Sequence, residues 1–153
     1  MSRYCPYTDK NIVYTECGEC EYHICEDDVF FCLVVGSRTF NDYDLMCHKL
    51  DKYLSKYKKV VIVTGGARGA DALGEKYGNE KGYPVIVMPA EWDKYGKYAG
   101  YKRNEDMHRF ISKQKNRGCA VFWDCKSAGT AHSFQLAEKY KNQLKVVRFH
   151  TDN

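Results

Sequence analysis

The sequence predicts an α/β domain in which helices flank a parallel sheet of about five strands. Short apolar runs recur along the chain, rich in β-branched and aromatic residues and without polar alternation, as expected for strands buried on both faces. Segments with apolar residues at helical spacing lie between these runs. Such regular alternation of strands and helices is typical of parallel sheets whose strands are joined by helical crossovers.

The predicted strands follow one another from residue 29 almost to the end of the chain. Their ranges are 29–35, 60–63, 85–88, 119–123 and 145–149. Cys32 and Cys119 fall inside strands, and we interpret them as inert core residues. The longest apolar run, 29–35, is too short to cross a bilayer, so we expect no membrane partner.

Four helices are predicted between the strands. The first has an apolar stripe from Tyr43 to Tyr57, with Asn41 as its expected N-cap. The others cover about 69–81, 102–115 and 128–141. Ligands of open parallel sheets bind beyond the carboxyl ends of the strands, so we expect the chemistry in the loops that follow the strands.

Composition and charge narrow the class of protein. The 153 residues are 44% hydrophobic and 29% charged, the balance of a soluble globular domain and not of a disordered or fibrous chain. A formal net charge of +4 permits nucleic-acid binding without requiring it. Because no apolar segment follows Met1, we expect the protein to be cytoplasmic.

Residues 1–28 differ from the α/β domain predicted for residues 29–153, because they are polar and rich in cysteine. A segment this polar cannot bury enough apolar surface to fold alone, and the binding of a metal would supply the missing stabilisation. Four thiolates satisfy tetrahedral zinc, and two of them form a Cys-x-x-Cys pair. We therefore predict a structural zinc appendage; His23 in place of Cys25, or a redox Cys-x-x-Cys pair, is the alternative. The predicted zinc ligands are Cys5, Cys17, Cys20 and Cys25.

The glycine-rich loop at 64–71 is the most informative of the loops. Its glycines allow a ligand to approach the backbone amides closely, and the helix that follows presents free N–H groups to a phosphate. Arg68 adds a charged fork for phosphate oxygens, and Asp71 either caps the helix or accepts hydrogen bonds from ribose hydroxyls. A tight turn that needs glycine for its geometry alone is the alternative interpretation.

All four loops that follow the first four strands contribute to a predicted ligand site. The candidate residues are Gly36, Ser37, Arg38, Gly65, Gly66, Ala67, Arg68, Gly69, Asp71, Glu91, Trp92, Arg103, Asn104, Ser127, Gly129 and Thr130. A P-loop nucleotide hydrolase is disfavoured because its phosphate-binding motif is absent. The stretch 92–101, rich in tyrosine and lysine, is interpreted as a lid over a small ligand, with a surface for single-stranded nucleic acid as the alternative.

Five motifs, at 36–38, 64–71, 89–92, 99–107 and 122–130, occur in the order seen in the SLOG superfamily. That superfamily includes the DNA-processing protein Smf/DprA and the Lonely Guy enzymes. From Phe31 to its end, the chain most resembles the YspA/YpsA-related branch, which is common in bacteria and their phages. The resemblance implies a Rossmann-like fold and a nucleotide-type ligand.

Three functions follow from the resemblance. The first is binding or sensing of a nucleotide or nucleotide-derived ligand. We also expect the protein to form a homo-oligomer, namely a dimer. The second is hydrolysis of an N-glycosidic bond, as in Lonely Guy enzymes, but the glutamate of their motif is missing after Gly129 and Thr130. Glu91 or Asp124 would have to replace it, so we expect a binding protein and not an enzyme. The third is binding of single-stranded DNA, as in Smf/DprA.

Overall fold

The computed structural model describes residues 2–5, 10–13 and 29–149, and its core is a five-stranded sheet. All neighbouring strands of this sheet run parallel, in the order β5-β4-β3-β6-β7. The strands are β3 (Val29–Gly36), β4 (Lys59–Thr64), β5 (Val85–Val87), β6 (Asn116–Trp123) and β7 (Gln143–Arg148). The predicted α/β class with about five parallel strands is therefore confirmed.

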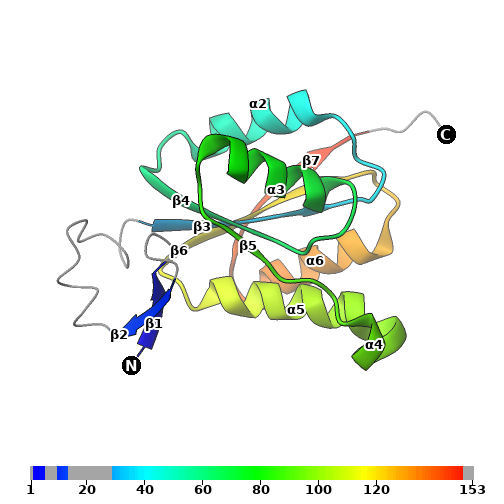
Figure 1. Ribbon diagram of the computed structural model, residues 1–153. Coiled ribbons are helices and arrows are strands. Elements are labelled where there is room, and N and C mark those ends of the chain that lie inside the picture. Colours follow the sequence, from blue (N-terminus) through cyan, green and yellow to red (C-terminus); the bar gives the residue numbers. More distant parts are fainter. Residues whose placement is uncertain (1, 6–9, 14–28, 150–153) are drawn as a thin grey trace.

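Helices cover both faces of the sheet, α2 and α3 on one and α5 and α6 on the other (Figure 1). Their bounds are α2 (Tyr43–Leu54), α3 (Ala70–Lys81), α4 (Trp92–Tyr95), η1 (Gly96–Tyr98), α5 (Ala99–Ser112) and α6 (Ala128–Lys139). The predicted N-cap of the first helix was wrong, because Asp42 and not Asn41 accepts the N–H of Leu45. Helix α5 also begins and ends earlier than predicted, since β6 already starts at Asn116.

The central strand β3 contributes side chains to both layers of the core. Phe30, Cys32 and Val34 pack with α2 and α3, whereas Phe31 and Leu33 pack against α5. This alternation along one strand is the expected pattern for a strand with helices on both sides. The predicted burial of Cys32 is confirmed, and that burial raises the pKa of its thiol to about 12.

The strand order determines where a ligand cleft can form. From β3 the chain crosses α2 to β4 and then α3 to β5, and it next returns to the other side of β3 to form β6. The loops after β3 and β6 therefore leave the sheet in opposite directions, and the carboxyl edge opens between them. This switch point is the usual ligand position in open parallel sheets.

A small antiparallel pair, β1 (Ser2–Cys5) with β2 (Lys10–Val13), lies in the N-terminal segment. Cys17, Cys20 and Cys25 lie outside the described residues, as does the side chain of Cys5. The zinc site and the division of the chain at residue 28 therefore stay predictions. Within the described part of the chain, no helix has the length and apolar content needed to cross a membrane.

Candidate functional site

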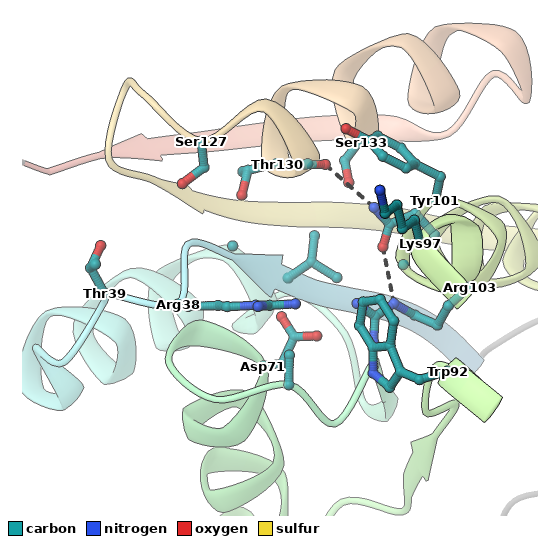
Figure 2. Close-up of a pocket in the computed structure, with 16 residues that line it drawn as sticks. Arg38, Thr39, Asp71, Trp92, Lys97, Tyr101, Arg103, Ser127, Thr130 and Ser133 are labelled. Carbon is teal, nitrogen blue, oxygen red and sulfur yellow. Dashed lines mark hydrogen bonds between the residues drawn. The ribbon is translucent and has the colours of Figure 1, made fainter. Parts of the chain in front are cut away.

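The loops at the carboxyl edge enclose a cleft with two lobes. The inner lobe is a cavity of about 300 Å³ that reaches from the end of β3 to the start of α6 (Figure 2). It is lined by Val35, Gly36, Arg38, Thr39, Ala67, Asp71, Trp92, Lys97, Gly100, Tyr101, Arg103, Asn104, Ser127, Gly129, Thr130 and Ser133. These residues come from a strand end, loops and helices that lie far apart in the sequence.

The outer lobe has a volume of about 570 Å³ and lies over the glycine-rich loop. It is lined by Arg38, Gly65, Gly66, Ala67, Arg68, Pro89, Ala90, Trp92 and Arg103. Four residues line both lobes, and we refer to them as the neck: Arg38, Ala67, Trp92 and Arg103. The two lobes are therefore parts of one cleft, and two of the four neck residues are arginines.

Asp71, in the first turn of α3, holds the glycine-rich loop together. Its carboxylate accepts the N–H of Gly65 at 3.1 Å, and its backbone carbonyl accepts the hydroxyl of Thr64 at 2.9 Å. The backbone N–H groups of Ala67 and Gly36 also favour the charged form of the carboxylate. Burial raises the pKa of Asp71 to about 6, although the charge of Arg103 and these N–H groups act in the opposite direction. The amide of Gly65, which the sequence suggested for a phosphate, thus donates to a carboxylate of the chain itself.

Arg103 reaches the same loop from α5. Its Nη1 donates to the carbonyl of Gly65 at 2.6 Å, and its Nε donates to Oδ1 of Asn104 at 3.1 Å. Burial lowers the pKa of Arg103, Asp71 raises it, and the nearby charge of Arg38 lowers it further. A Cβ at Gly65 would lie 2.6 Å from both Arg103 and Asp71, so a larger residue here would displace both side chains. The loop, the arginine and the carboxylate form one compact unit.

Arg38 faces this unit from the opposite side of the cleft (Figure 2). Its guanidinium lies 6.0 Å from the ring centroid of Trp92, whose side chain is half exposed on α4. Within the described residues the guanidinium has no hydrogen bond or salt bridge to an acceptor. It therefore keeps its donors available for a ligand.

Asp124 organises the turn that leads into α6. It accepts the N–H groups of Lys126 and Ser127 at 2.8 Å each and the hydroxyl of Ser127 at 3.0 Å. Burial opposes ionisation of this carboxyl, but the hydrogen bonds prevail and lower its pKa to about 2. Ser37 supports the same turn, since its hydroxyl accepts the N–H of Asp124 at 3.0 Å. Both residues therefore position the start of α6.

The start of α6 presents hydroxyl groups to the inner lobe. Thr130 and Ser133 are buried, at 7% and 2% exposure, and both line this lobe (Figure 2). Neither hydroxyl has a hydrogen-bond partner among the described residues. Asn104 is held beside them because its Nδ2 donates to the carbonyl of Gly129 at 3.3 Å. The hydroxyls of Thr130 and Ser133 are therefore available to form hydrogen bonds with a molecule bound in the inner lobe.

Most of the predicted site residues line the cleft, and three do not. Ser37 faces the turn before α6, Glu91 is an exposed residue that precedes α4, and Gly69 belongs to neither lobe. Gly69 has a φ of +80°, and a Cβ there would lie 2.5 Å from the carbonyl of Ser37, so the turn itself requires this glycine. Arg68 lines the outer lobe, but the charge beside Asp71 is that of Arg103.

Sequence reasoning missed several lining residues on the helices. Ser133 follows Thr130 by three residues, so helical spacing alone places it on the same face of α6. Lys97 and Tyr101 fall in the stretch interpreted as a lid, and both line the inner lobe. Thr39, which follows the motif at 36–38, and Gly100, which lies in the motif at 99–107, also line the inner lobe but were not among the predicted site residues.

Positively charged side chains outnumber negatively charged ones in the lining of the cleft. Four cationic side chains line it: Arg38, Arg68, Lys97 and Arg103. Among the described residues, Asp71 is the single acidic side chain in its lining. Glu91 lines neither lobe, and Asp124 accepts the hydrogen bonds of the turn that leads into α6. The cleft has the electrostatics of an anion-binding site.

Comparisons with known proteins agree with the fold and with the family resemblance. A model of the YspA, cpYpsA-related SLOG family matches residues 32–95. The Gene 61 protein of Mycobacterium phage D29 is 33% identical over 116 residues, which cover 70% of this chain and 87% of the phage protein. DNA processing protein A from Helicobacter pylori, described for its single-stranded DNA binding mode, matches with a TM-score of 0.51. That match has 19% identity and covers 82% of this chain and 68% of the other, so it reflects the shared fold.

Proposed function

This chain belongs to the YspA, cpYpsA-related SLOG family, and from that premise we propose that it binds a nucleotide or nucleotide-derived ligand in the cleft. The observation that carries the proposal is the charge of the cleft lining, in which four cationic side chains, Arg38, Arg68, Lys97 and Arg103, accompany one acidic side chain, the buried Asp71. A cleft of this charge at the switch point of a parallel sheet suits a phosphorylated ligand.

The phosphate binds at the neck, between Arg38 and Arg103. These two guanidinium groups are close enough for Arg38 to lower the pKa of Arg103, so they repel each other in the empty cleft. An anion placed between them removes that repulsion and gains charge-assisted hydrogen bonds. The N–H of Gly65 already donates to the carboxylate of Asp71, so we assign the phosphate to the arginines and not to the loop amides.

The remainder of the ligand has suitable partners on both sides of the neck. The half-exposed ring of Trp92 offers a stacking surface for a base, and in the inner lobe the carboxylate of Asp71 is an acceptor for hydroxyls of a ligand. Binding and not turnover is the role that these residues support, because the cleft holds no second acid beside Asp71 among the described residues.

Calorimetric titration with AMP, GMP, UMP and CMP tests the proposal. Arg38→Ala removes a charge-assisted bond worth about 1.5–3 kcal/mol, so the affinity for the best ligand should fall roughly 10- to 100-fold. The fold should survive, because Arg38 is exposed and hydrogen-bonds no other described side chain. Arg109→Ala is the matched control, since it removes the same charge from α5 outside the cleft.

The control should change affinity by less than about 2-fold, the scale of a screened surface charge. Equal affinities for Arg38→Ala and the parent protein would refute the position of the phosphate. Absence of binding by all four nucleotides would refute the nucleotide ligand itself.

Binding of single-stranded DNA is a second candidate function, favoured by the surface around α4. Three exposed aromatic side chains, Trp92, Tyr98 and Tyr101, lie within ten residues of one another and alternate with lysines. Exposed rings beside cations are the usual platform for unpaired bases. The related fold of DNA processing protein A, described as a single-stranded DNA binder, adds support.

Tyr98 separates the two functions because it is 76% exposed and lines neither lobe. If the surface binds DNA, Tyr98→Ala should weaken binding of a fluorescent oligothymidine by about 1–3 kcal/mol, read as anisotropy. Mononucleotide affinity should not change. Unchanged DNA affinity in Tyr98→Ala would remove this candidate.

A further inference from the structure

The cleft has a lobe on each side of its cationic neck, which is more than a mononucleotide needs. A mononucleotide ends in its phosphate, so with that phosphate at Arg38 and Arg103 it occupies one lobe only. Resting on the proposed function, we propose that the ligand is a nucleoside diphosphate linked to a second sugar, with the diphosphate at the neck and one end in each lobe. This defines the class of ligand that the cleft accepts.

The chemistry of the inner lobe favours the sugar. Its wall carries the hydroxyls of Thr130 and Ser133, which are buried and have no hydrogen-bond partner among the described residues. Asp71 and Asn104 add an acceptor and an amide to the same lobe. A polyhydroxylated ring can satisfy such groups with donors and acceptors at once, whereas a base offers only its edge.

The chemistry of the outer lobe favours the nucleoside. Its floor is the glycine-rich loop, where Gly65 and Gly66 add no side chain, and its wall includes Pro89 and Ala90. Arg68 stands in this lobe with an exposed guanidinium, which can stack on a base as well as pair with a phosphate. Trp92 belongs to the neck, so the base can reach its ring from this side.

The charge at the neck matches the linkage. Two arginines line both lobes, and a diphosphate diester carries two negative charges. Arg38 can offer its guanidinium fork to one phosphate, whereas Arg103, whose Nη1 and Nε donate to Gly65 and Asn104, offers Nη2 to the other. A terminal diphosphate carries more negative charge, so charge alone would make it bind more tightly than the sugar-linked form.

That contrast provides the test. Affinities of the full-length protein are measured by calorimetry for three matched series: AMP, ADP and ADP-glucose; UMP, UDP and UDP-glucose; GMP, GDP and GDP-mannose. In the series with the preferred base, we expect the sugar-linked compound to bind about 10-fold more tightly than the monophosphate and at least as tightly as the diphosphate. Ser133→Ala should weaken the sugar-linked compound about 2- to 10-fold, the value of one hydrogen bond, and leave the monophosphate unchanged.

Ser112→Ala, which removes a hydroxyl from α5 outside the cleft, is the control for the serine variant. The inference is overturned if monophosphates bind and no sugar-linked compound exceeds its matched mono- and diphosphate, and the proposed function then stands. It is also overturned if Ser133→Ala weakens the monophosphate as much as the sugar-linked compound. If none of the nine compounds binds at millimolar concentration, the proposed function and this inference both fail.

Discussion

Replacing Asp71 with asparagine should change how the stability of the protein depends on pH. Burial raises the pKa of Asp71 to about 6 in the folded protein, whereas an aspartate in an unfolded chain titrates near 3.9. Between these values the folded state binds the extra proton, so this carboxyl contributes stability that is complete below about pH 4 and is lost as the pH rises through about 6. A shift of about 2 pKa units corresponds to about 3 kcal/mol.

Asp71→Asn keeps the shape of the side chain and removes its titration. From pH 4 to pH 7 the unfolding free energy of the variant should therefore rise by about 3 kcal/mol relative to the parent protein. Urea denaturation at each pH unit, extrapolated linearly to water, measures this difference. Asp93→Asn, at an exposed carboxyl on α4, is the matched control.

The comparison must be between variant and parent, because His108 titrates over an overlapping range with the opposite sign. Burial lowers the pKa of His108 to about 4, so its contribution to stability is lost as the pH falls from about 6.5 to 4. This contribution is common to both proteins and cancels in the difference. If the stabilities of Asp71→Asn and the parent run parallel between pH 4 and pH 7, the account of a buried, destabilised carboxylate under the glycine-rich loop is incorrect.

The remaining predictions concern the loop, the metal and the reaction. Gly69→Ala should lose about 1–3 kcal/mol of stability in urea denaturation, more than Gly82→Ala, because both glycines have positive φ but only at Gly69 does a Cβ meet backbone. Elemental analysis of protein purified without chelator should find one zinc per chain; its absence, or disulfides between the predicted ligands, would refute the zinc site. Nucleoside monophosphates should release little or no free base, and turnover of about 1 per second or more would make this protein an enzyme.

Local sequence patterns were sufficient to predict the five strands of the parallel sheet and its four larger helices. The run that became β3 is apolar throughout because both of its faces are buried, whereas the stripe of α2 is periodic because one face is buried. The strand order was beyond such patterns, since nothing local states that β6 joins β3 on the side opposite β4. The position of the switch point therefore had to come from the structure.

The candidate site was predicted in its loops and less well in the roles of its residues. Arg68 lies in the glycine-rich motif and received most weight, but Arg103, 38 residues away from Gly65 in sequence, is the arginine that contacts the loop. The sequence suggested Ser37 as a ligand-binding residue and Asp124 as a candidate acid. In the structure the hydroxyl of Ser37 accepts the N–H of Asp124, 87 residues away in the sequence. Spacing in sequence identifies which loops meet, whereas the direction of each side chain depends on tertiary contacts.

The central claim is that a phosphate binds between the two arginines of the neck. A crystal structure of the protein grown with a saturating concentration of its best nucleotide tests this most directly. We expect phosphate oxygens at about 3 Å from the guanidinium nitrogens of both Arg38 and Arg103. A nucleotide bound outside the cleft, with both guanidinium groups left without a phosphate partner, would contradict the claim.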